Sequence, residues 1–161
     1  MPATVRPAKS EDLDAMARMG AALAALHHGF DPERFMLPPE IEAGYRSWFA
    51  RELRNRSAVL QVAESEGTVV GYAYGRLDGR DWNALLDAHG GFHDLWVDPA
   101  ARRTGAGTLL AQAMMQRLTE LGAPRVVLMA AARNESARAL FESLGWRATM
   151  VEMTRESFPK S

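Results

Sequence analysis

The most informative stretch of the chain runs from Leu95 to Leu110 and reads LWVDPAARRTGAGTLL. A strand over 92–97 leads into it and ends at the pair Asp98-Pro99, because the residue before a proline disfavours helical backbone. The spacing of apolar residues then predicts a helix over 104–121. The apolar run 126–130 follows and is typical of a strand buried on both faces. Together these elements predict a right-handed βαβ unit with a parallel strand pair.

The turn into this helix carries the pattern Arg-x-x-Gly-x-Gly. The first amides of a helix have no partner within the helix, and the macrodipole adds about half a positive charge there. Gly105 and Gly107 allow a phosphate to approach the backbone, and Arg102 and Arg103 can add charge-assisted hydrogen bonds. The pattern therefore predicts a pyrophosphate site, although a Gly-x-Gly turn can also be a simple tight connection. A Rossmann fingerprint or a Walker loop is excluded, because the third glycine and the Lys-Ser/Thr pair are missing.

The rest of the chain predicts a mixed α/β fold in which most neighbouring strands are antiparallel and helices cover both faces of one sheet. We expect all of 1–161 to form a single domain. The expected elements are an edge strand over 3–8, helices from Ser10 to Gly29 and from Ile41 to Leu53, a hairpin of strands 58–64 and 68–77, a helix over 136–144, and a last strand over 149–154.

Composition excludes several classes of function. With 19 Lys and Arg against 20 Asp and Glu, the formal net charge is −1, so a nucleic acid or an anionic membrane is not expected as a partner. The chain has no cysteine, which removes disulfides, thiolate metal sites and a Cys nucleophile. The sequence begins without the pattern of a signal peptide, and no run reaches the roughly 20 apolar residues of a membrane helix. We therefore expect a cytoplasmic protein.

A second motif, NESARALFESLGW from Asn134 to Trp146, completes a resemblance to the GNAT superfamily of acyl-CoA-dependent N-acyltransferases. The resemblance implies a sheet that splays apart at the parallel strand pair and acetyl-CoA as co-substrate, with no metal. It also implies which residues hold coenzyme A: Leu95, Trp96 and Val97 along the pantetheine arm, Arg102, Arg103, Thr104, Gly105, Ala106, Gly107 and Thr108 at the phosphates, and Asn134 and Phe141 on the last helix.

The resemblance implies direct attack of an amine on the thioester within a ternary complex. The lack of cysteine is consistent with direct attack, because the protein cannot carry the acetyl group on a thiol of its own. Phe141 stands where a tyrosine acid is common, and Met129 where a glutamate base is often found. Asp94 and His93 remain as candidate bases, and we expect them to point to opposite faces of their strand, so that only one faces the substrate. Their alternative roles are a cap or ion pair for Asp94 and simple packing for His93.

We therefore expect an N-acetyltransferase that acts on a primary amine of a small molecule, an amino acid or a peptide. The alternatives are a catalytically degenerate module that binds acyl-CoA for regulation and a generic phosphate-binding α/β domain. Connections 27–39 and 78–91 are expected to build the acceptor pocket, and the pair His27-His28 lacks the spacing of a metal site. The short tail after Gly145 leaves a sheet edge that a second subunit could complete, which makes a homodimer a further hypothesis.

Overall fold

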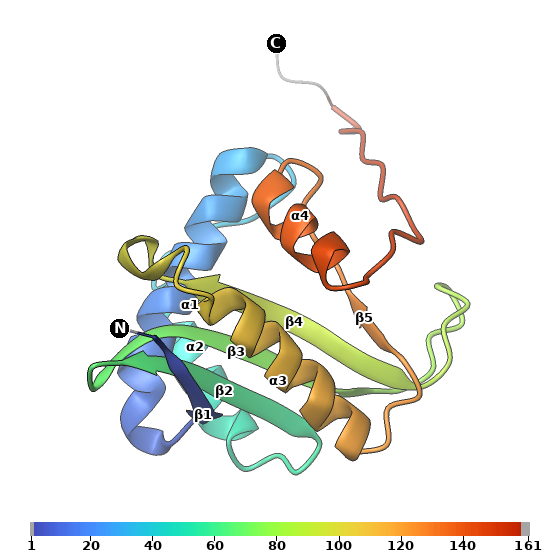
Figure 1. Cartoon of the computed structure of the whole chain (residues 1–161). Helices are drawn as coiled ribbons and strands as arrows, with labels where there is room; N and C mark the ends of the chain where they lie inside the picture. The colour runs from blue at the N-terminus through green and yellow to red at the C-terminus, as the bar shows by residue number, and fades with distance from the viewer. Residues whose placement is uncertain (1, 159–161) are drawn as a thin grey trace.

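The computed structural model describes residues 2–158 and consists of one five-stranded sheet with helices on both faces (Figure 1). The strand order is β1-β2-β3-β4-β5; every neighbouring pair is antiparallel except β4 and β5, which are parallel. This confirms the predicted mixed, mostly antiparallel fold. The elements are β1 (Thr4–Pro7), η1 (Ser10–Asp12), α1 (Leu13–Phe30), α2 (Ile41–Glu52), β2 (Ala58–Ser65), β3 (Thr68–Asp78), β4 (His89–Val97), η2 (Pro99–Ala101), α3 (Ala106–Glu120), β5 (Val126–Leu128) and α4 (Glu135–Ser143).

The sheet separates two apolar cores, because successive side chains of a strand point to opposite faces. On one face, α3 contributes Leu110 and Met114, and Phe141 of α4 joins the same cluster. On the other face, α1 and α2 pack against Tyr72 and other side chains of β2 and β3. Gly75 of β3 lets α3 approach closely, since an added Cβ would lie 2.7 Å from the Met114 sulfur and 2.7 Å from a backbone oxygen of β4.

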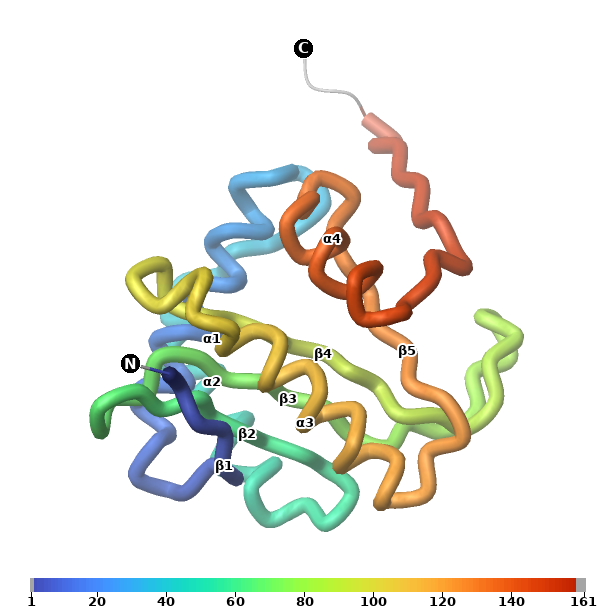
Figure 2. The backbone as a smooth tube through the Cα atoms, in the orientation of Figure 1, coloured from blue at the N-terminus to red at the C-terminus, as the bar shows by residue number. Residues whose placement is uncertain are grey.

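Strands β4 and β5 pair over a short distance and then diverge. Their register joins Gly90 to Val126, Gly91 to Val127 and Phe92 to Leu128. Beyond Phe92, β4 stays paired with β3 as far as Val97, whereas the chain after β5 turns towards α4 (Figure 2). A gap therefore opens between the parallel strands within the described chain, as the family resemblance implied.

A β-bulge at His93 changes the phase of β4. Tyr74 of β3 pairs with Asp94, but the next residue, Gly75, pairs with Phe92, so His93 is the extra residue. The prediction that His93 and Asp94 point to opposite faces is therefore wrong. Asp94 contacts Tyr72, and the His93 ring lies 5.7 Å from that of Tyr74, so both candidates lie on the face that carries α1 and α2.

The C-terminal part of the prediction is also wrong in two places. Strand β5 ends at Leu128 and is only partly buried, and Met129 is 85% exposed, so 126–130 is not a strand covered on both faces. The segment 149–154 is not a strand either, although it is extended and exposed. The physical reason is the same for both, since no further strand pairs with the outer edge of β5 within residues 2–158.

The beginning of α1 differs from the prediction as well. Ser10 is not an N-cap; it opens the short helix η1, and the carboxylate of Asp12 instead accepts the backbone N–H of Lys9 at 2.7 Å. Gly29 does not end the helix, which continues to Phe30. Gly122 and Gly145 do follow α3 and α4 with positive φ angles of 98° and 91°, as expected of glycines at helix C-termini.

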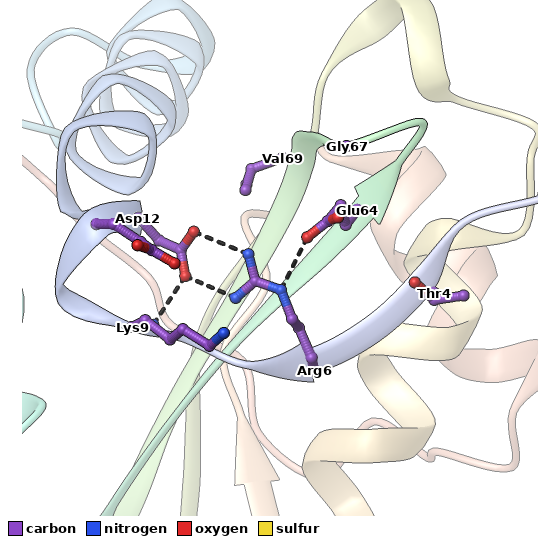
Figure 3. Close-up of a pocket in the computed structure, with 8 residues that line it drawn as sticks. Thr4, Arg6, Lys9, Asp12, Glu64, Gly67 and Val69 are labelled. Atoms are coloured by element: carbon purple, nitrogen blue, oxygen red, sulfur yellow. Dashed lines mark hydrogen bonds and ion pairs between the residues drawn. The ribbon is translucent and has the colours of Figure 1, made fainter.

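A network of ion pairs joins this helix start to the sheet. The guanidinium of Arg6 on β1 lies between Asp12 and Glu64, with one nitrogen 2.8 Å from each carboxylate (Figure 3). These side chains line a polar surface hollow of about 670 Å³ beside the β2–β3 hairpin. Because Arg6, Asp12 and Glu64 are paired with one another, we interpret the hollow as a structural junction that ties β1, β2 and η1 together.

Replacing Asp12 with Asn should reveal this junction through the pH dependence of stability. The hydrogen bond from Arg6 holds the pKa of Asp12 below its ordinary value. A lowered pKa adds stability above the unfolded-state value of about 3.9, and that stability is lost as the pH falls through the folded-state value. At pH 7 the free energy of unfolding should therefore drop by about 2 kcal/mol in Asp12→Asn, measured by urea denaturation.

The control is Asp14→Asn, which removes an exposed ion pair with Arg46 and should cost less than about 0.5 kcal/mol. The difference between wild type and Asp12→Asn should shrink below pH 4. A difference that stays constant down to pH 2, or equal losses in both variants, would contradict the account.

Candidate functional site

The gap between β4 and β5 continues as a small cavity of about 70 Å³. Four parts of the chain surround it: the second half of α1, β4 at its bulge, the segment after β5, and the first turns of α4. The cavity is open to the surface and is lined by Leu23, His27, Phe92, His93, Asp94, Leu95, Leu128, Met129, Ala130, Asn134, Ala137 and Phe141.

The end of β4 leads directly to the N-terminus of α3. The helix begins at Ala106, two residues later than predicted, and Gly105 precedes it in the left-handed conformation with φ 84°. An added Cβ at Gly105 would have no heavy atom within 4 Å, so this side of the turn faces open space. The backbone amides of the first helical turn have no acceptors inside the helix. This turn therefore fits a phosphate group.

The two arginines of the turn differ in their contacts. Arg102 donates from Nε to the carbonyl oxygen of Val97 at 3.1 Å, and its guanidinium lies 5.0 Å from the ring centre of Trp96. It is thus folded back along the end of β4. Arg103 is exposed and has a positive φ of 67°, and the hydroxyl of Thr104 donates to the backbone oxygen of Ala101. Two positively charged side chains therefore directly precede the open turn.

Two side chains of the second motif reach the cavity from α4. Asn134 caps the helix, with its side-chain oxygen accepting the backbone N–H of Ala137 at 3.2 Å. Phe141 is buried and packs edge to face against Phe92 and Trp146. Phe141 therefore provides an apolar wall but no proton donor.

Asp94 lies at the bulge, where the cavity meets the α1–α2 face. Its Oδ2 accepts a hydrogen bond of 2.8 Å from the hydroxyl of Tyr72. Burial raises the pKa of Asp94 above its ordinary value, while the Tyr72 hydrogen bond and the charges of His93 and His27 act in the opposite direction. A carboxylate with a raised pKa is a stronger base than an exposed one.

His93 lies beside Asp94 but is anchored towards β3. Its Nε2 is 2.8 Å from Oδ2 of Asp78, and the side chain remains exposed. Gly91 makes this contact possible, because an added Cβ there would lie 2.0 Å from the Asp78 oxygen and 2.5 Å from His93 Nε2. The imidazole is therefore oriented by the Asp78 carboxylate at the rim of the cavity.

The two connections expected around the acceptor behave differently. His27, in the last turns of α1, lines the cavity, and its ring packs edge to face against Phe30 and Phe35. The loop 79–88 contributes no residue to the cavity lining among the described residues, and its Trp82 is largely exposed. No residue of 78–91 lines this cavity; the lining residues of β4 begin at Phe92, so the expectation that 78–91 builds the pocket is not met here.

The structure brings five of the predicted site residues together at the cavity: His93, Asp94, Leu95, Asn134 and Phe141. Trp96, Val97 and the turn from Arg102 to Thr108 lie at the adjoining end of β4, outside the lining. Sequence reasoning missed Tyr72, because in the hairpin its alternation indicates only a core position. The register between β3 and β4, which the sequence does not show, is the information needed to place Tyr72 near Asp94.

Within residues 2–158, no three His, Asp or Glu side chains gather as metal ligands. No helix of this part of the chain is long and apolar enough to cross a membrane.

Comparison with known proteins assigns the family. Residues 22–146 match the acetyltransferase (GNAT) family, and the chain therefore belongs to the GNAT acetyltransferase family. A mycothiol acetyltransferase from Thermomonospora curvata is 31% identical over 114 residues, which is 70% of this chain. The match covers 38% of that larger protein, so the chain spans well under half of its length.

Solved structures share the fold at lower sequence identity. A mutant of the BH1408 protein from Bacillus halodurans superposes with a TM-score of 0.81 at 20% identity, covering 96% of this chain and 99% of that chain. A predicted acetyltransferase from Clostridium acetobutylicum, crystallised with acetyl-CoA, superposes with a TM-score of 0.72 at 16% identity, covering 94% and 96%. These likenesses extend the GNAT fold to nearly the whole described chain.

Proposed function

We propose that residues 1–161 form a single acetyl-CoA-dependent N-acetyltransferase domain. The observation that carries the proposal is that one stretch of chain lines the cavity with the bulge of β4 and, a few residues beyond the end of that strand, forms the open turn before α3. One end fits a phosphate and the other end holds a carboxylate with a raised pKa. Membership of the GNAT family and the mycothiol acetyltransferase relative support acetyl transfer as the reaction.

The proposed roles in binding follow the path from the turn to the cavity. Arg102, Arg103 and the amides from Thr104 to Thr108 hold the pyrophosphate of coenzyme A. The free edge of β4 at Leu95, Trp96 and Val97 offers backbone groups to the amides of the pantetheine arm. Asn134 and Phe141 of α4 close the other side. Bound in this way, acetyl-CoA supplies the acetyl thioester.

Asp94 is the proposed general base. It accepts the proton that the acceptor amine loses as the amine nitrogen bonds to the acetyl carbon, while the carbon–sulfur bond breaks and the sulfur keeps the electron pair. A backbone N–H near Val97 is the candidate donor for the oxyanion. Because Phe141 has no acidic proton, the sulfur leaves as a thiolate without a side-chain acid. His93, oriented by Asp78, is the alternative base on the same face.

The proposed acceptor is a primary amine of a small molecule, an amino acid or a peptide. It would enter from the α1–α2 face, past His27 and the aromatic rings of Phe30 and Phe35. A second candidate function is a regulatory module that binds acyl-CoA without turnover. The regulatory module is favoured by two positions at which an acid or a base was expected from the family resemblance, because Phe141 and the exposed Met129 can serve as neither.

Turnover separates these two functions. With acetyl-CoA, a panel of amines and a thiol reagent that reports released coenzyme A, we expect turnover that depends on the amine. Asp94→Asn should lower kcat by at least about 100-fold with little change in the KM for acetyl-CoA, because it removes the base but not the binding site. Asp87→Asn, in the loop 79–88, is the control and should retain wild-type kcat.

Two results would count against the proposal. Tight binding of acetyl-CoA with no turnover on any amine would favour the regulatory module. Full activity of Asp94→Asn would remove Asp94 as the base and leave His93 as the candidate.

The position of the pyrophosphate is tested by Gly105→Glu. The new carboxylate would lie among the phosphates, so the affinity for coenzyme A measured by calorimetry should fall by at least about 100-fold. Gly122→Glu is a matched control, because Gly122 also has a positive φ and open surroundings but lies at the other end of α3. Normal binding by the Gly105 variant, or equal loss in both variants, would place the phosphates elsewhere.

A second copy of the chain is the proposed partner at the β5 edge. Met150, Val151 and Met153 are each at least 80% exposed in the extended segment after α4, and β5 has no further strand at its outer edge among the described residues. An open sheet edge and exposed apolar side chains each favour pairing between subunits. The pairing would extend the sheet beyond β5 in both copies.

Light scattering should therefore give twice the chain mass of 17.7 kDa for the wild type. The double variant Met150→Asp with Met153→Asp should be monomeric, because it places charges in the shared sheet. Met36→Asp, at an equally exposed methionine between α1 and α2, should remain dimeric. A wild-type protein with the mass of one chain at 100 µM would contradict the dimer.

A further inference from the structure

Tyr72 is a polar side chain in the centre of an apolar core. The residue is fully buried, and its ring packs edge to face against Phe49 of α2 with centroids 5.5 Å apart. Burying a hydroxyl without a partner is costly, so a phenylalanine would serve equally well for packing alone. The hydroxyl has one partner of consequence, the Asp94 carboxylate at 2.8 Å.

The bulge in β4 creates this pairing. Tyr72 lies directly across from Trp96 in the register of β3 and β4, so Asp94 is its diagonal neighbour two residues away. The extra residue at His93 places Asp94 on the same face as Tyr72. Without the bulge, a strand in phase with the buried Phe92 would carry Asp94 and Trp96 together on the α3 face.

We propose that Tyr72 is the positioning residue of the general base: its buried hydroxyl holds the Asp94 carboxylate at the mouth of the β4–β5 gap in its charged form. The inference rests on the proposed function, because it assigns Tyr72 a role through Asp94. Tyr72 itself does not line the cavity, whereas Asp94 does. The hydroxyl occupies Oδ2 and leaves Oδ1 of Asp94 to receive the proton.

The groups that face Asp94 come from every element packed against it: Tyr72 from β3, Tyr45 from α2, His27 from α1 and His93 from β4. Burial raises the pKa of the carboxyl, and the Tyr72 hydrogen bond is the largest influence that lowers it. Burial also raises the pKa of Tyr72 well above its ordinary value, and that of Tyr45 to about 12. Both phenols therefore stay neutral at neutral pH, and Tyr72 remains a hydrogen-bond donor.

Tyr72→Phe tests the proposal, because it keeps the ring and removes only the hydroxyl. Loss of a hydrogen bond to a charged carboxylate raises its pKa, so the acidic limb of the pH profile of kcat/KM should move up by about one pH unit. The matched control is Tyr74→Phe, on the same strand and face, whose hydroxyl donates to Glu52 at 2.9 Å. Tyr74→Phe loses a buried hydrogen bond of similar length but should leave the acidic limb in place.

A titration of the Asp94 carboxyl by carbon NMR in the free protein provides a second readout that needs no turnover. Its midpoint should rise in Tyr72→Phe and not in Tyr74→Phe. In the Asp94→Asn background, Tyr72→Phe should cause no further loss of kcat, because the two residues act as one unit.

The outcomes separate this inference from the function on which it rests. An unmoved acidic limb and an unmoved NMR midpoint in Tyr72→Phe, with Asp94→Asn inactive, would overturn the role of Tyr72 alone. Wild-type activity of Asp94→Asn would overturn both the base and its positioning residue. Equal shifts in Tyr72→Phe and Tyr74→Phe would show a general response of the core and would also overturn the proposal.

Discussion

The divergence of β4 and β5 is the constraint on which the rest of the site depends. The two strands share hydrogen bonds only beside Gly90, Gly91 and Phe92. Past that point the edge of β4 faces a gap, and unpaired backbone groups favour an extended partner that carries amides of its own. The bulge at His93 lies at the start of this gap, where it bends the strand and turns Asp94 towards the α1–α2 core. The opening of the sheet and the position of the candidate base thus have a common local origin.

The gap also separates two chemical environments. On the α3 and α4 side lie the open turn at Gly105 and the apolar wall formed by Phe141, which suit an acyl carrier with a charged end. On the α1 and α2 side lie Asp94, His93 and the ring of His27, which suit an acceptor that must lose a proton. A GNAT acetyltransferase needs both environments to meet at one carbon atom. In this chain Phe141 from one side and Asp94, His93 and His27 from the other line the same cavity, and the turn at Gly105 follows from the adjoining end of β4.

Sequence patterns predicted the fold where they record local geometry. The hairpin of β2 and β3, the βαβ unit and the glycines after α3 and α4 each depend on a short run of residues, and all were found as expected. The bulge was not predicted, because it is a mismatch between two strands and leaves no mark in the residues of β4 alone. For the same reason, the sequence does not indicate the role of Tyr72, because that role depends on which residue of β4 lies diagonally across from it. The segment 149–154 has the composition of a strand, but a strand also needs a neighbour with which to pair.

Amide hydrogen exchange with and without coenzyme A tests the central claim most directly, since it reports on the backbone of both ends of the site at once. If the gap and the turn form one acyl-CoA site, coenzyme A should slow exchange at Leu95 to Val97 and at Arg103 to Thr108. Exchange in the junction around Arg6 should not change. Slowed exchange at only one of the two segments, or at neither while coenzyme A is bound, would contradict the account.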